Sequence, residues 1–182
     1  MAYYRMDWQR VPPPGKRFAA LGRAPDLPIP WTMGIPYGRP LPEPIQCSLH
    51  PRGGPDLPDL FLNSIPLFSD RLLAALDAAG VDNIVRYSVE ISDLAGGVRR
   101  DYKAVNIVGA VRCADLDRSE YLEGMEPPVM AFQRLVIDEA RARDLPLFRL
   151  AESSLVILVA ERVKRALAAA SLLGVEVAPL DA

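Results

Sequence analysis

The prolines divide this chain into two parts. Fourteen of its 18 prolines lie before Ser69, in runs such as residues 11–15 and 39–44. Proline fixes φ and has no backbone N–H to donate, so this part cannot form a long helix or a central strand. It nevertheless contains aromatic residues, which disordered segments usually lack: Trp8, Phe18, Trp31, Tyr37, Phe61 and Phe68. We therefore expect residues 1–68 to form an extended arm that packs on the rest of the protein, in preference to a disordered leader. Residues 3–6 can form a first strand.

A short pattern occurs twice after the proline-rich part. Residues 69–76 and 160–167 place an acidic residue, an arginine, aliphatic residues and Ala-Leu in the same order, and each copy leads to a Gly-Val pair. Acidic residues stabilise the first turn of a helix, and glycine commonly ends one. The first copy predicts a helix that Ser69 caps and Gly80 ends. The second predicts a helix over residues 161–173, about one turn longer, which exits at a glycine.

The two copies differ at one capping position. Ala160 stands where the first copy has Ser69, so the second helix lacks a side-chain cap at its start. Arg71 and Arg162 occupy matching positions, and we expect them to pair with carboxylates at the helix starts in a structural role. Few residues are identical between the copies, so the sequence leaves open whether the pattern is a true duplication.

Runs of β-branched and aromatic residues predict strands around these helices. The runs at 84–91 and 102–111 flank a Gly96-Gly97 turn and predict a hairpin. Further strands are expected at 134–138, 147–150 and 175–177, while residues 155–159 are either a buried strand or the entry to the second helix. The sequence therefore predicts an α+β fold, a mostly antiparallel sheet with two main helices on one face. In this interpretation residues 69–182 are the core, and the arm completes one structural domain.

Composition narrows the functional classes. The formal net charge is −2 and the lysines and arginines are interspersed with acids, so no basic stripe favours nucleic-acid binding. The one histidine, His50, lies in the arm, where we expect it to be a solvated surface residue. Cys47 and Cys113 are far apart and are expected to be free thiols in a reducing cytosol. We therefore expect no catalytic residue, no metal site, no cofactor, no membrane span and a cytoplasmic location.

The most polar candidate site is an acidic run within the turn-like residues 115–128. Two aspartates at i and i+2 can serve as an acid–base or metal pair, whereas capping of local turns is the plainer interpretation. A third interpretation is an acidic patch that meets a basic protein partner. The charged residues 138–144 are interpreted as a solvated connection. The residues of the acidic run are Asp115, Asp117, Glu120, Glu123 and Glu126, with Arg112 and Arg118 among them.

Several of these motifs together resemble a bacterial immunity-protein family. It was formerly a domain of unknown function and is associated with myxobacterial-type polymorphic toxins. The resemblance runs from about residue 66 to residue 179 and is fainter through the arm. The motifs that carry it lie at residues 69–72, 75–76, 80–83, 87–91, 105–108, 113–121, 147–150, 159–163 and 174–175, with Tyr102 and Leu167.

This resemblance implies a non-enzymatic antitoxin that binds the toxic C-terminal domain of a cognate effector in the cytoplasm. Toxins paired with such proteins are often nucleases, so an acidic patch could occupy a basic groove and block substrate entry. Two other hypotheses stay open from the residues alone. One is a structural module that self-associates through the Ala/Leu-rich second helix. The other is an enzyme that uses Asp115, Asp117 or Glu120 as an acid, a base or a metal ligand.

Overall fold

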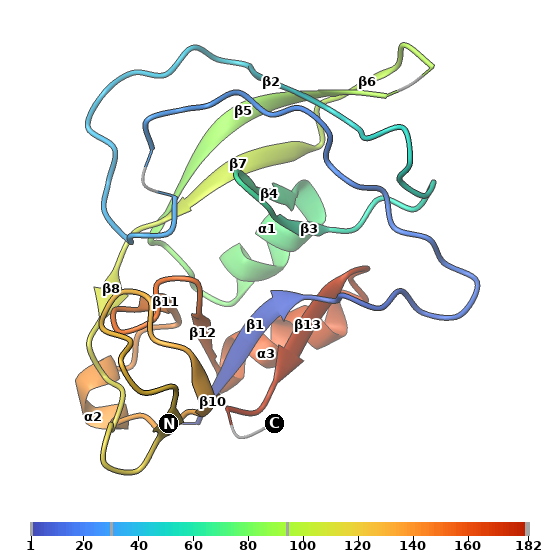
Figure 1. Cartoon of the computed structure of the whole chain (residues 1–182). Helices are drawn as coiled ribbons and strands as arrows, with labels where there is room; N and C mark the ends of the chain where they lie inside the picture. Colours follow the sequence, from blue (N-terminus) through green and yellow to red (C-terminus); the bar gives the residue numbers. More distant parts are fainter. Residues whose placement is uncertain (1, 30, 94, 181–182) are drawn as a thin grey trace.

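The computed structural model describes residues 2–29, 31–93 and 95–180. Strands and helices are mixed along the chain, which confirms the α+β prediction. The expected single sheet is wrong, because the described strands form two sheets and a separate hairpin. We name the sheets after their places in Figure 1, where the lower sheet contains β1 and the upper sheet contains β5.

The lower sheet has the strand order β13-β1-β12-β11-β8. Its strands are β1 (Tyr3–Trp8), β8 (Ala110–Val111), β11 (Leu147–Leu150), β12 (Ile157–Ala160) and β13 (Val175–Ala178). The upper sheet has the order β2-β5-β7-β4-β3, with β6 paired to β5. Its strands are β2 (Ile45–Ser48), β3 (Leu60–Leu62), β4 (Pro66–Ser69), β5 (Ile84–Ser92), β6 (Val98–Arg99) and β7 (Tyr102–Ile107). The hairpin is β9 (Glu120–Tyr121) with β10 (Phe132–Arg134), and the helices are α1 (Asp70–Ala78), α2 (Glu139–Ala142) and α3 (Glu161–Ala169).

The predicted strand over residues 102–111 breaks at Gly109, where the chain passes from the upper sheet to the lower one. Gly109 has a φ of 124°, which glycine adopts far more readily than other residues. Its amide donates to the Gly34 carbonyl (2.7 Å), and its carbonyl accepts from the Arg149 amide (3.0 Å). The next two residues form β8 and pair in parallel with β11. One glycine inside an apolar run therefore separates the two sheets.

The first helix is confirmed and the second needs a correction. The Ser69 hydroxyl accepts from the Leu72 amide (3.1 Å), and Gly80 has a φ of 77° after the helix. Ala160 provides no side-chain cap for α3, as expected. However, α3 has nine residues like α1, so the prediction of a longer helix is wrong. It ends before Ser171, which has a φ of 49°, because the following residues bond to another segment instead of to the helix.

The two sheets contain the same four-stranded unit. In the upper sheet the unit is β3-β4-β7-β5 with α1, and in the lower sheet it is β11-β12-β1-β13 with α3. All neighbouring strands within both units are antiparallel. In each unit a strand runs directly into the helix, and a loop from the helix leads to the strand at the opposite edge. The strand that completes the lower unit is β1, which comes first in the chain, so the second unit is circularly permuted.

The register agrees at both edges of the two units. Ser69 faces Tyr102 in the upper unit, and Ala160 faces Tyr3 in the lower one. On the other side of the middle strand, Ile84 faces Ile107 and Val175 faces Trp8. Helix and loop thus have equal lengths in both units, and the strands that follow them begin in the same register. This agreement favours a true duplication. The match of Gly80 is Ser171, not Gly174.

Side-chain contacts repeat with the register. The Tyr102 hydroxyl donates to the Pro58 carbonyl (2.9 Å), and the Tyr3 hydroxyl donates to the Leu145 carbonyl (3.1 Å), in each case two residues before the first strand of the unit. The Tyr102 ring lies 5.9 Å from the ring of Phe61, and the Tyr3 ring lies 5.4 Å from the ring of Phe148. The two units therefore repeat the same side-chain packing as well as the same strand order.

The two matched arginines join the helices to each other. Arg71, at the start of α1, donates to the carbonyls of Ala170 (3.2 Å) and Ser171 (3.1 Å) at the end of α3. Arg162, at the start of α3, donates to the Ala79 carbonyl (3.3 Å) at the end of α1. The C-terminal carbonyls of a helix lack partners and carry its negative dipole end, so a cation is favoured there. The expected pairing with a carboxylate at a helix start is found for Arg71, which lies 3.7 Å from Asp59 beside the cap of α1, but the carbonyls at the end of α3 are nearer.

Apolar side chains from both units form one central cluster. It combines Met6 of β1, Phe68 of β4 and Leu147 of β11 with residues of α1 and α3. A second cluster covers the upper sheet, where Trp31 packs edge-on against Tyr87 with ring centroids 5.8 Å apart. Trp31, Phe61 and Phe68 are buried, whereas Trp8 is exposed. The domain boundary at residue 68 stays a prediction.

Asp59 connects the two units with a buried carboxylate. It is 4% exposed, accepts from the Ser69 hydroxyl (2.5 Å) and accepts from the Leu173 amide (2.7 Å) after α3. Its own amide donates to the Leu173 carbonyl (2.7 Å). The matching residue of the lower unit is Pro146, which has no carboxylate, so only the upper unit provides such a link. The bonds between Asp59 and Leu173 also explain why α3 ends at Ala169, earlier than predicted.

Asp59→Ala should lower the free energy of unfolding by about 2 kcal/mol, because it leaves the Ser69 hydroxyl and the Leu173 amide without their acceptor. Urea unfolding followed by circular dichroism measures this change. Asp26→Ala is the matched control, since Asp26 is exposed and should shift the midpoint little. An unchanged midpoint for Asp59→Ala would contradict this account.

A circular permutant tests the repeat. We would open the chain between Pro14 and Gly15, which are exposed, and join the original ends through a short Gly-Ser linker. Arg5 faces Ala178 in an antiparallel pair, so β13 can lead into β1 as a hairpin. The permutant should unfold cooperatively in urea, because its second unit now has the chain order of the first. Deletion of residues 1–10 should abolish cooperative unfolding, and loss of cooperativity in the permutant itself would count against the repeat.

Candidate functional site

The candidate site lies on the connection between the two repeated units. Residues 112–146 link β8 to β11 and contain the β9–β10 hairpin and α2, none of which has a counterpart in the repeat. The turn between β11 and β12 packs against this connection, since the Met130 amide donates to the Glu152 carbonyl (3.1 Å). A framework of repeated strands thus carries a non-repeated surface segment, the usual place for binding residues.

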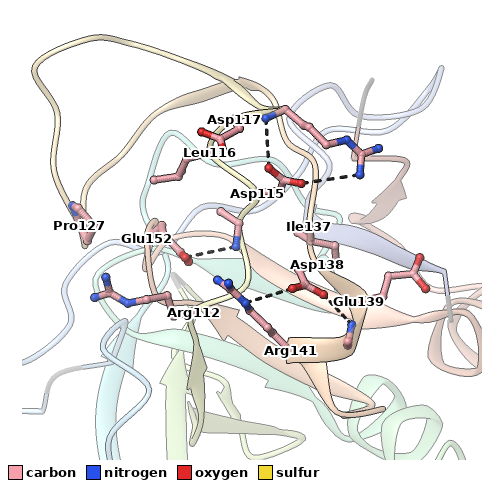
Figure 2. A pocket seen from close by; sticks show the side chains of 13 residues that line it. Arg112, Asp115, Leu116, Asp117, Pro127, Ile137, Asp138, Glu139, Arg141 and Glu152 are labelled. Carbon is pink, nitrogen blue, oxygen red and sulfur yellow. Dashed lines mark hydrogen bonds and ion pairs between the residues drawn. The ribbon is translucent and has the colours of Figure 1, made fainter.

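A cavity of about 630 Å³ opens between these segments (Figure 2). Its lining side chains include five carboxylates and three guanidinium groups, so acidic charge is in excess. Pro127, Leu116 and Ile137 add apolar wall. The full lining is Arg112, Ala114, Asp115, Leu116, Asp117, Arg118, Pro127, Ile137, Asp138, Glu139, Ala140, Arg141 and Glu152.

Asp115 shapes the turn at one edge of the cavity. Its side chain accepts from the Arg118 amide (3.2 Å), and its backbone carbonyl accepts from the Ser119 amide (2.9 Å). The Arg118 guanidinium lies 3.7 Å from the same carboxylate. An aspartate that bonds to amides two or three residues ahead is a common turn device. This geometry matches the plainer interpretation of Asp115 as a turn residue.

Asp138 forms the opposite edge of the cavity. It caps α2 by accepting from the Ala140 amide (3.0 Å), pairs with Arg141 (3.1 Å) and donates its own amide to the Cys113 carbonyl (2.7 Å). The charged residues of 138–144 are mostly exposed, as expected for a solvated connection, but the segment also forms a capped helical turn in which Ala142 is buried. The strand expected at 134–138 is misplaced, because β10 covers Phe132–Arg134 and the later residues turn inward, with Leu135 buried.

Glu152 is the buried carboxylate of the cavity, and the sequence interpretation missed it. It is 3% exposed, and its Oε1 accepts from the Ala114 amide (3.2 Å). Its Oε2 is buried and makes no hydrogen bond within the described residues. Buried polar atoms nearly always have partners, so this oxygen needs an explanation. The available signal was a glutamate between two apolar strands, at residues 147–150 and 155–159.

The five predicted acidic residues are divided between two places. Asp115 and Asp117 line the cavity. Glu120 pairs with Arg134 (2.9 Å) across the hairpin, while Glu123 and Glu126 are exposed in the loop that joins β9 to β10. The last three do not line the cavity, so the run is not one cluster of carboxylates.

An apolar cavity of about 400 Å³ lies next to the acidic one. Its lining includes Pro128, which directly follows Pro127 of the acidic cavity, together with Met125 and Phe132. Two of its side chains are unusually exposed for their type, Val129 at 62% and Leu155 at 73%. Exposed apolar groups beside charged ones are typical of protein interfaces.

Other candidate chemistry finds little support within the described part of the chain. No group of three or more His, Cys, Asp or Glu residues there could hold a metal ion. His50 is exposed, as expected, and its Nδ1 accepts from the Arg52 amide (3.1 Å). None of the described helices has the length and apolar character that a membrane crossing needs.

Comparison with known families agrees with the resemblance seen in the sequence. The immunity protein family model Imm11 matches residues 4–181, nearly the whole chain. The chain belongs to the Imm11 immunity protein family. A search of curated proteins finds no match. The match spans both repeated units and the connection between them, so the cavity lies inside the family's domain.

Cys113 lies beneath the acidic cavity of this family member. Both cysteines are free and buried, which confirms the expected thiols. Burial raises the pKa of the Cys113 thiol from 9.0 to about 12, with further contributions from the Glu152 and Asp138 charges. Burial alone raises the pKa of Cys47 to about 11. Both thiols therefore stay neutral in the folded protein at neutral pH.

Both thiols should react with Ellman's reagent far more slowly in the folded protein than after unfolding in guanidinium chloride, at about pH 8. Because the folded pKa values lie above those of the unfolded chain, the thiols stabilise the fold fully below pH 9.0. This contribution is lost as the pH rises toward about 11 for Cys47 and about 12 for Cys113. Rapid labelling of native protein would show that the burial is wrong.

Proposed function

We propose that this protein binds the toxic domain of a cognate polymorphic toxin in the cytoplasm and neutralises it by covering its active site. The observation that carries the proposal is the surface of the non-repeated connection. There, exposed apolar side chains lie beside acidic ones, on a segment that has no counterpart in the repeat. Family membership supports the same role.

The apolar side chains supply the centre of the proposed interface. Leu122, Val129 and Leu155 are all exposed and come from the β9–β10 connection and the β11–β12 turn. Burial of such side chains on binding excludes water and contributes most of the affinity at protein interfaces. A desolvated centre of this kind explains how a small protein can hold a toxin tightly.

Acidic side chains supply the rim. Asp117, Glu123 and Glu126 are exposed and have no ion pair with a described residue, so a basic partner can approach them without breaking such contacts. Complementary charge speeds encounter and selects among partners. A nuclease is the partner class that fits, because its substrate groove must be basic to hold phosphates. A protein placed over that groove blocks the substrate.

The self-association hypothesis has weaker support from α3. Val163 and Leu167 of this helix face the core, and its outward residues carry ion pairs of Glu161 with Lys164 and Arg165. Lys164 also lies over the Tyr4 ring, 3.7 Å from its centroid. A helix face with this pattern is a solvated one.

Reversal of the acidic rim tests the proposal. Asp117→Lys, Glu123→Lys and Glu126→Lys together should weaken binding to the toxin domain encoded beside this gene by at least about a hundredfold, because like charges then meet. Calorimetry on purified proteins measures the Kd, and co-expression measures protection of cells. Leu155→Asp should weaken binding independently by removing an apolar contact.

The matched control makes the same change of charge elsewhere. Asp26, Asp82 and Glu176 are exposed and form no ion pair among the described residues, so their replacement by lysine should leave Kd and protection unchanged. If both triple variants behaved alike, the acidic rim would not be the interface. If unchanged protein failed to bind the toxin or to protect cells, the proposed function itself would be wrong.

A further inference from the structure

We propose that the acidic cavity is a receptor for a single arginine side chain of the toxin, held by the Glu152 carboxylate. This inference rests on the proposed function and deepens it by naming the chemistry of one contact. It begins from Glu152, because this carboxylate is almost completely buried while one of its oxygens lacks a partner. Such an atom costs stability in the free protein, and a ligand that pairs with it recovers that cost.

None of the described cationic side chains pairs with Glu152. Arg118 is paired with Asp115, and Arg141 is paired with Asp138. Arg112 also lines the cavity but pairs with no described carboxylate, and in Figure 2 its guanidinium points away from Glu152. The described residues therefore supply no donor to this oxygen, and we assign that role to the ligand.

The position of Glu152 is fixed before any ligand arrives. Its carbonyl accepts from the Met130 amide (3.1 Å), and the neighbouring Ser154 amide donates to the Pro128 carbonyl (2.9 Å). The buried Arg149 holds the same turn by donating to the Ser154 carbonyl (2.8 Å). A carboxylate held by its own turn loses little conformational freedom on binding.

The shape and lining of the cavity favour arginine over a metal ion. About 630 Å³ is far larger than a bare ion needs, and the described carboxylates do not converge as a set of metal ligands. Leu116, Pro127 and Ile137 offer an apolar wall for the methylene stem of an arginine. A guanidinium group also presents several donors in a plane, which suits a carboxylate better than the compact ammonium of lysine.

The first test needs no toxin. The probe is N-acetyl-arginine methylamide, and the readout is the ¹H–¹⁵N resonance of Ala114, whose amide bonds to Glu152. The probe should shift this resonance saturably with a Kd of about 1 mM, a typical strength for one side chain. N-acetyl-lysine methylamide should bind at least about threefold more weakly.

Two variants decide whether Glu152 carries the effect. Glu152→Gln keeps the size and an acceptor for Ala114 but removes the charge, so saturation by the arginine probe should disappear. Glu152→Asp keeps the charge but withdraws it by one methylene, so it should weaken the probe by several fold. The control Asp82→Asn removes an exposed carboxylate elsewhere and should change nothing. Equal titrations of unchanged protein and Glu152→Gln, or a preference for the lysine probe, would overturn the inference.

The second test uses the complex. Glu152→Gln should weaken toxin binding by about ten- to a hundredfold, as expected when one partner of a buried charge pair is lost. If the toxin bound unchanged protein and Glu152→Gln equally, the arginine receptor would be wrong and the proposed function would stand. If unchanged protein failed to bind the toxin at all, the proposed function would fail, while the probe titration would still report on the cavity.

Discussion

The antiparallel pairing of α1 and α3 is the constraint on which the rest of this structure depends. Each helix begins with an arginine that reaches the last carbonyls of the other, so the two helices satisfy each other's unpaired ends. Such caps add to the apolar contacts of the central cluster, where side chains of both sheets meet both helices. A helix of nine residues is unstable alone, so each helix depends on its packing against the other helix and against the strands of its own unit.

The connection between the units has a buried side and an exposed side. Cys113 and Leu135 pack into a third apolar cluster with residues of the lower sheet, so part of residues 112–146 belongs to the core. The exposed side is shaped by turn and cap contacts of Asp115 and Asp138. Both cavities are lined in large part by this connection. Under the proposed function, recognition of a different toxin would require changes among its exposed residues, which can vary without loss of the core.

Local signals in the sequence predicted the local structure well. The Ser69 cap, the Gly80 exit, the missing cap at Ala160 and the two free thiols follow from the chemistry of single residues. The repeat was harder to see, because its fourth strand in the lower unit is β1, far away in the chain, and the registers align Gly80 with Ser171. Gly109 was interpreted as part of a strand, since a positive φ cannot be read from composition. Glu152 was missed for a related reason: burial of a charge is decided by tertiary packing.

A buried carboxylate that lacks a partner destabilises the free protein, but it can help the protein to distinguish one binding partner from another. An unpaired buried acceptor destabilises a fold by about 1–3 kcal/mol, so a glutamine or an apolar residue at position 152 would be the safer choice for stability alone. In the proposed complex, the same unpaired atom favours a toxin that brings a donor to this point, because a toxin without one leaves the acceptor unpaired. Acidic side chains attract any basic surface, and nucleases resemble many other nucleic-acid-binding proteins in having a basic groove. Discrimination between such partners therefore needs a contact that depends on position as well as on charge, and under our proposal the buried Glu152 carboxylate provides it.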